Sequence, residues 1–332
     1  MFAPATRATE PRQDFASCSG CGLCLLVCPV WQRERDIGLT PLVRAKALQF
    51  GAIAADLEAS VQSCTLCAAC EPVCPEDIAL VAMTLGLRAQ LLPPATAQGL
   101  RARMDEQAAL PTAPAPSAAT LLLPGRALRA RAATLARTLR LLGGERQVAT
   151  AADDGADMVL ALEAGLPLPA KRMERFLQPL RRSTKLVVGD GLLLRELRRW
   201  LPQTKIESLG AALSGVAAVR RALRASDLYV IEARAYHADY ERLVRHYDAL
   251  RAAAGCAFNL DLQRIALPAR ARSLAQTLGI EAVDDRAQLR WILQGRSVAR
   301  IVVEDPADGA AFAQVTELPV VHLADLADDG SS

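Results

Sequence analysis

Long apolar runs and signals for export are missing from this chain of 332 residues. The longest apolar runs, 78–87 and 209–219, are shorter than the about 20 residues that cross a bilayer. The first residues, MFAPATRATEPRQDFASC, lack the apolar core of a signal peptide. We therefore expect a cytoplasmic chain with no membrane span of its own, which reaches a membrane only through a partner.

Histidine, aromatic residues and excess charge are also scarce. The net charge is +3 and the cations are dispersed, which argues against a nucleic-acid partner. The three histidines, His237, His246 and His322, stand too far apart to suggest a site, and we expect His237 and His246 to be surface or cap residues. No arrangement of Ser, His, Asp or Cys resembles a nucleophilic triad, so we predict no catalytic residue.

Cysteine is the exception, because eight of the nine cysteines lie in two copies of the pattern CxxCxxCxxxCP. Three thiolates at successive three-residue steps let a short loop wrap one face of an iron–sulfur cube. In the bacterial ferredoxin arrangement the fourth cysteine of each run binds the other cluster. We therefore predict two 4Fe-4S clusters with these metal ligands: Cys18, Cys21, Cys24 and Cys74 for cluster 1, and Cys64, Cys67, Cys70 and Cys28 for cluster 2.

Zinc and disulfides are the alternatives for these cysteines. Zinc sites usually use two separated CxxC pairs without a third cysteine at the same step. Clustered cysteines in a chain without an export signal indicate metal ligands before disulfides. Gly20 and Gly22 flank Cys21, where backbone N–H groups can approach cluster sulfides, whereas the second run has Thr65 and Ala68 instead.

The spacing of the two runs predicts a helical domain. The 35 residues between Cys28 and Cys64 contain helix formers at 41–50 and 53–61, and a further helix is expected over 78–92. We predict four parts in the chain: a flexible leader (1–17), a cysteine domain (18–110), a Pro/Ala linker (111–118) and a C-terminal domain (119–326).

The C-terminal domain alternates between strands and helices. Strands are expected at 120–123, 158–162, 185–188, 228–232, 258–265, 300–303 and 320–322. Helices are expected at 126–142, 171–180 and 192–200. The pattern predicts an α/β domain with a mainly parallel sheet. Its halves, about 119–222 and 225–326, read as a degenerate duplication, since KLVVGDGLLLREL in one matches RIVVEDPADGAAF in the other. We interpret Gly189-Asp190-Gly191 as a tight turn and predict no nucleotide cofactor.

The runs CSGCGLCLLVCPVW and CTLCAACEPVCPEDI resemble the dicluster module of the glycolate oxidase iron–sulfur subunit, the lactate-utilisation iron–sulfur proteins and the heterodisulfide reductase family. They are also similar to the helical ferredoxin domain of succinate dehydrogenase iron–sulfur subunits. The resemblance implies an α+β multidomain chain, with an all-α helical-ferredoxin dicluster domain ahead of the α/β domain. It also implies a ferredoxin-type electron-transfer subunit of an oxidoreductase complex.

The C-terminal resemblance is weaker, because the two CCG repeats of the glycolate oxidase group are degenerate here. No CCG occurs, and Cys256 is the only cysteine after Cys74. The resemblance implies a flavoprotein dehydrogenase partner, of the hydroxy-acid class, with electrons passing to quinone or another carrier. Two alternatives stay open: a heterodisulfide reductase-like catalytic subunit, which needs more cysteines, and a free-standing ferredoxin-like carrier.

Overall fold

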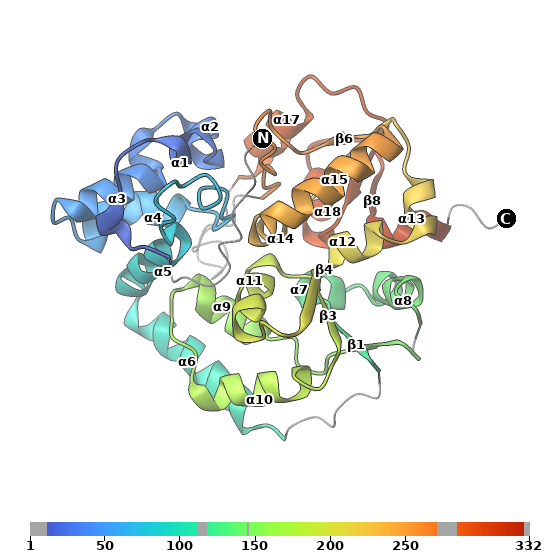
Figure 1. The fold of residues 1–332 in the computed structure, drawn as a ribbon, viewed down its shortest axis with the longest axis horizontal. Coiled ribbons are helices and arrows are strands. Elements are labelled where there is room, and N and C mark those ends of the chain that lie inside the picture. The colour runs from blue at the N-terminus through green and yellow to red at the C-terminus, as the bar shows by residue number, and fades with distance from the viewer. Residues whose placement is uncertain (1–11, 112–117, 145, 271–283, 329–332) are drawn as a thin grey trace.

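The computed structural model describes residues 12–111, 118–144, 146–270 and 284–328. A helical N-terminal region lies beside two α/β halves, each built on its own sheet (Figure 1). In Figure 1 the helical region runs from blue to turquoise, the first half from green to yellow, and the second half from orange to red. This is the predicted fold class, except that the expected single sheet is two parallel sheets.

The described part of the N-terminal region is built of helices and loops, with one isolated β-bridge between Gln13 and Ile78. Its helices are η1 (Phe15–Ser17), α1 (Leu23–Leu26), α2 (Pro29–Glu34), η2 (Ile37–Leu39), α3 (Pro41–Gln49), η3 (Ala54–Leu57), α4 (Glu58–Ser63), α5 (Leu80–Leu91) and α6 (Pro94–Ala109). Prolines begin α2, α3 and α6, where their missing N–H leaves no helical bond unmade. The three helices predicted between and after the cysteine runs are confirmed.

Two predicted segments fall largely outside the described residues. Of the leader 1–17, only 12–17 are described, and there Gln13 pairs with Ile78. Of the linker 111–118, only the two end residues are described. Among the residues that are described, no helix has the length and apolar character needed to cross a bilayer.

The first α/β half is a four-stranded parallel sheet in the order β2-β1-β3-β4. Its elements are β1 (Thr120–Leu123), α7 (Gly125–Arg129), α8 (Ala132–Leu141), β2 (Val148–Thr150), α9 (Ala156–Glu163), α10 (Ala170–Leu180), β3 (Lys185–Val188), α11 (Gly191–Trp200), β4 (Lys205–Ser208), α12 (Leu209–Ser214) and α13 (Ala217–Ala222). Leu100 and Met104 of helix α6 (Pro94–Ala109) pack against Ala161 of α9 in this half.

The second half repeats that order as β6-β5-β7-β8, again all parallel. Its elements are β5 (Asp227–Val230), α14 (Ala233–Ala238), α15 (Tyr240–Ala254), β6 (Ala257–Phe258), α17 (Arg286–Leu293), β7 (Arg300–Val303), α18 (Pro306–Phe312), β8 (Val320–His322) and η4 (Leu323–Asp328).

The two sequence segments proposed as duplicates occupy equivalent places in the two sheets. KLVVGDGLLLREL forms β3 and α11, and RIVVEDPADGAAF forms β7 and α18, the third strand of each sheet order with its following helix. Asp190 caps α11 by accepting the N–H of Leu192 at 3.0 Å, and Asp305 caps α18 by accepting that of Ala307 at 2.8 Å. The halves therefore share one fold.

Several strand predictions are wrong. Residues 158–162 form helix α9, since Met158 and Ala161, three positions apart, turn to the core as a helix requires. The second strand of the first sheet is instead β2, and β4 completes that sheet; both are short strands with few apolar residues. The strand expected over 258–265 is only the two residues of β6.

Two glycines allow the halves to meet closely. A Cβ on Gly191 of α11 would lie 2.3 Å from the Ala235 nitrogen of α14, and one on Gly210 of α12 would lie 2.0 Å from Glu304 Cδ. Neither distance is possible for a real side chain. The glycine of the predicted strand-to-helix turn is thus needed for the packing of the two halves.

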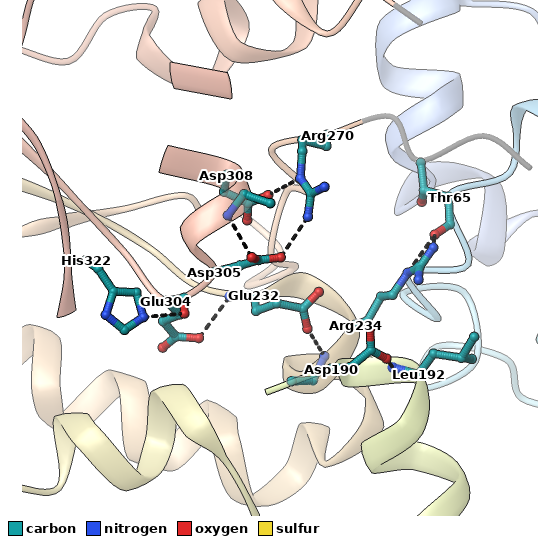
Figure 2. A network of polar contacts seen from close by, with 12 residues as sticks. Thr65, Asp190, Leu192, Glu232, Arg234, Arg270, Glu304, Asp305, Asp308 and His322 are labelled. Carbon is teal, nitrogen blue, oxygen red and sulfur yellow. Dashed lines mark hydrogen bonds and ion pairs between the residues drawn. The ribbon is translucent and has the colours of Figure 1, made fainter. Parts of the chain in front are cut away.

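Glu304 directly follows β7, and its carboxyl group is buried at this contact between the two halves. It accepts hydrogen bonds from the hydroxyls of Tyr229 (2.7 Å) and Tyr247 (2.5 Å) and from the Glu232 backbone N–H (2.9 Å). Its neighbour His322 bonds the Glu304 backbone carbonyl, as Figure 2 shows. Burial raises the pKa of Glu304 to about 7, against the hydrogen bonds that favour the carboxylate.

Glu304→Gln should give a pH-dependent loss of stability. Because the pKa of Glu304 is higher in the folded chain than in the unfolded chain, the protonated carboxyl stabilises the folded chain. This contribution is complete below about pH 4.5 and is lost as the pH rises through about 7. The two values correspond to about 3 kcal/mol at most. The deficit of the variant in unfolding free energy should therefore shrink between pH 5 and pH 8 in chemical denaturation. Glu106→Gln, at an exposed position of α6, is the control, and a pH-independent deficit for Glu304→Gln would contradict the account.

Candidate iron–sulfur site

Two glycines set the backbone path of the first cysteine loop. Gly20 and Gly22 lie either side of Cys21 with φ of +82° and +78°, in the left-handed region. Residues with a Cβ avoid that region by about 1–2 kcal/mol. The loop leads Cys24 into α1, and Cys28 then stands immediately before Pro29, the first residue of α2.

The second cysteine loop repeats this left-handed pattern without glycine. Leu66 (φ +53°) and Ala68 (φ +65°) stand two and four residues after Cys64, as Gly20 and Gly22 do after Cys18. Leu66 is 2% exposed and belongs to an apolar cluster that also contains Ala68 and Leu192 of α11. Burial by the first α/β half offsets the backbone strain that glycine avoids in the first loop.

The eight cysteines of the runs line two cavities, four in each. We call the first the outer cavity, lined by Cys18, Cys21, Cys24 and Cys74. We call the second the inner cavity, lined by Cys28, Cys64, Cys67 and Cys70. This is the grouping that exchange of the fourth cysteine between runs requires, although ligation itself stays a prediction. Cys256 is 3% exposed in an apolar core and lines neither cavity.

The walls of the two cavities are apolar and partly shared. Pro41 of α3 and Leu80 of α5 line both, so the cavities are neighbours. Leu66 and Val81 also line the inner cavity, and Ile78 lines the outer one. Within the described residues, no three His, Cys, Asp or Glu side chains converge closely enough to hold a single metal ion. The sulfurs instead surround two spaces.

The two cavities differ in the solvent exposure of their cysteines. Cys21 is exposed at the outer cavity, whereas Cys28 and Cys67 of the inner cavity are buried. Burial raises the pKa of Cys24 and of Cys67 to about 12, which favours the neutral thiol. At Cys64 burial acts in the same sense, but the guanidinium groups of Arg44 and then Arg88 outweigh it and lower the pKa. The inner cavity therefore has cations that stabilise thiolate.

Three arginines surround the Cys64 end of the inner cavity, and all are at most 3% exposed: Arg44, Arg88 and Arg234. Arg88 of α5 donates to the Cys64 carbonyl at 2.5 Å and to the Glu163 carbonyl at 2.9 Å. Burial lowers the pKa of Arg88 to about 10, so it remains charged at neutral pH. The sequence did not single out these arginines, because an arginine at helical spacing usually marks a solvated face.

The second α/β half holds the backbone of the second cysteine loop directly. Arg234 of α14 donates from Nε and Nη2 to the Thr65 carbonyl, at 3.1 and 3.0 Å (Figure 2). It also forms a buried ion pair with Glu163. His237, one turn later, bonds the Cys67 carbonyl through Nδ1 at 2.8 Å. Burial lowers the pKa of His237 to about 4, so the neutral ring donates this bond.

His237 therefore corrects a sequence prediction. It was expected at the surface or in a cap, but it is 5% exposed because the short helix α14 lies against the cysteine loop. No local pattern around position 237 indicates this burial, because the contact is made with Cys67, 170 positions earlier in the chain. His246 instead bonds Ser214 Oγ at 2.7 Å.

The first α/β half supplies a further anchor at the end of the second loop. Arg195 of α11 forms a bidentate pair with Glu71, with distances of 2.6 and 3.1 Å. The same carboxylate accepts the Val81 backbone N–H at 2.9 Å, which fixes the start of α5. Both halves thus contribute to the shape of the inner cavity.

The residues present fit two iron–sulfur clusters. Each cavity offers four thiols, the donor that iron–sulfur clusters use, and largely apolar walls. Around the inner cavity, Nε of Arg44 and Nε of Arg88 are buried with no hydrogen-bond partner among the described residues. Buried donors of this kind suit an anionic group, and a cluster with four thiolate ligands carries negative charge.

Comparison with known families agrees with this chemistry. Residues 14–78 match the family model of a 4Fe-4S dicluster domain. No curated protein and no solved structure matches the chain. This part of the chain is therefore an iron–sulfur, ferredoxin-type domain that binds 4Fe-4S clusters. The narrower resemblance to glycolate oxidase or heterodisulfide reductase subunits stays a prediction.

Gly22→Ala should destabilise the cysteine domain by about 1 kcal/mol, through backbone conformation alone. A Cβ there meets nothing within 4 Å, so steric contact adds no cost. Gly86→Ala is the matched control, since Gly86 lies in the middle of α5, again with open space for the Cβ. It should stabilise the chain by about 0.5–1 kcal/mol. Chemical denaturation gives the free energy of unfolding of both variants. Changes of the same sign in the two variants would contradict the account.

Proposed function

We propose that this chain is an electron-transfer subunit with two 4Fe-4S clusters. Cys18, Cys21, Cys24 and Cys74 would hold cluster 1, and Cys64, Cys67, Cys70 and Cys28 would hold cluster 2. The single observation that carries the proposal is the division of the eight cysteines between two neighbouring cavities, four to each. When bound, each cluster takes up and releases one electron at a time.

The chain's own residues have separable tasks in this proposal. The thiolates would bind iron, and the shared wall of Pro41 and Leu80 keeps the two cavities adjacent. Arg234 and His237 orient the backbone of the second cysteine loop. The proposal assigns no catalytic residue to this chain, and any catalytic activity would belong to a partner.

The outer cavity is the side proposed for electron exchange with the partner. Cys21 is exposed there, and Leu23 and Leu26 on α1 are 44% and 49% exposed. An exposed cluster ligand beside exposed leucines suits contact with another protein. From the resemblance of the cysteine runs we propose a flavin-dependent, hydroxy-acid-oxidising dehydrogenase as donor, and quinone or another carrier as acceptor.

Iron analysis tests the number of clusters. The anaerobically purified chain should contain about eight irons and eight acid-labile sulfides, as two four-iron clusters require. Cys74→Ser and Cys28→Ser should each reduce the iron content by about half, because each removes one ligand from a different cavity. Zinc in place of iron in the anaerobic protein would overturn the proposal.

The same variants test the exchanged ligands by electron paramagnetic resonance of the reduced protein. Cys74→Ser should give the spectrum of Cys18→Ser, since both line the outer cavity, and Cys28→Ser should give that of Cys64→Ser. Cys256→Ser is the control and should leave the spectrum unchanged. If Cys74→Ser gave the spectrum of Cys64→Ser, each run would hold its own cluster.

A further inference from the structure

Helix α3 lies against both cavities. Pro41 lines the two of them, Arg44 lines the inner cavity, and Leu42 and Ala45 line the outer one. Lys46, two residues after Arg44, points to the other loop, where its Nζ lies 3.4 Å from the Cys18 carbonyl. One short helix therefore presents one cation to each cysteine set.

Arg44 is an unusual cation because it is buried without a carboxylate. It is 2% exposed, and its Nη1 donates to the Ser60 carbonyl (2.7 Å), the Ser60 hydroxyl (2.9 Å) and the Leu39 carbonyl (3.3 Å). Within the described part of the chain it forms no ion pair, and its Nε is buried without a partner. Burying an uncompensated charge is costly, so a nearby anion is needed to hold it there.

The other buried charges near the inner cavity do not supply that anion. Glu163 forms its ion pair with Arg234, and Arg88 donates to the Glu163 backbone carbonyl, so this carboxylate is already paired with another arginine. Glu71, the carboxylate nearest Cys70, is paired with Arg195. The anion that compensates Arg44 must therefore lie in the inner cavity itself.

We propose that Arg44 is the counter-charge of the cluster held by Cys28, Cys64, Cys67 and Cys70, and that it raises the reduction potential of that cluster. The inference rests on the proposed function. Adding one electron makes the occupied cavity more negative, and a fixed buried cation stabilises that state more than the oxidised one. The effect is local, because Arg44 lines only the inner cavity, whereas Lys46 lies at the outer loop.

Redox titration of the full chain, followed by electron paramagnetic resonance, tests this inference. In Arg44→Gln one of the two reduction steps should move to lower potential while the other stays in place. Arg44→Lys keeps the charge and should restore most of the shift. Ser60→Ala removes a hydrogen bond of Arg44 but leaves its charge, so both steps should remain unmoved. In Lys46→Gln the step that Arg44→Gln moves should stay where it is.

Each result decides between charge and structure. An unmoved step in Arg44→Gln with full iron content would overturn the inference, and so would a matching shift in Ser60→Ala. If Arg44→Gln fails to bind iron at the inner cavity while Arg44→Lys binds it, the need for a cation is supported. If both fail, Arg44 acts through its shape and the inference falls. A wild-type chain without iron would instead refute the proposed function.

Discussion

The bond between Arg234 and the Thr65 carbonyl is the contact on which the rest of the site depends. Residues 64–79 contain no helix and no strand, so the second cysteine loop has no regular backbone bonding of its own. Its carbonyls are held from outside by Arg88, Arg234 and His237. The α/β halves are therefore a structural part of the iron–sulfur site, because they hold the loop that supplies three of the four cysteines lining the inner cavity.

Charge imposes a second constraint on the same place. Four thiolates in a dry cavity are unfavourable unless positive charge lies near them. A bound cluster would supply part of that charge, and Arg44 with Arg88 supplies part of the rest, as the lowered pKa of Cys64 indicates. The outer cavity reaches solvent at Cys21 and has less need of buried cations. Two copies of one cysteine pattern thus lie in two different electrostatic environments.

The sequence was informative where chemistry is local. The cysteine spacing predicted a four-iron dicluster domain, and helical periodicity predicted α3 and α5. Periodicity failed at 158–162, where a short apolar run suits a strand or a helix equally and packing on Phe176 and Leu193 favoured the helix. It also missed β2, which has only three residues, and β4, in which Ile206 is the one apolar residue.

Long-range contacts could not be predicted from the sequence. Arg234 lies 169 residues after Thr65, and nothing local distinguishes it from a surface arginine. The left-handed Leu66 and Ala68 could have been inferred by aligning the second run with Gly20 and Gly22, but only the buried neighbours of Leu66 explain why glycine is not needed there.

Hydrogen–deuterium exchange of the iron-loaded chain tests most directly whether the α/β halves hold the cluster loop. Arg234→Met should speed exchange of the backbone amides between 64 and 71. Arg172→Met is the matched control, since Arg172 is also buried and paired, with Asp153 at 2.8 Å and Asp157 at 2.6 Å, but its hydrogen bonds among the described residues go to these two carboxylates and not to the cysteine loop. That variant should leave exchange in the loop unchanged. Equal effects of the two variants on the loop would contradict the account.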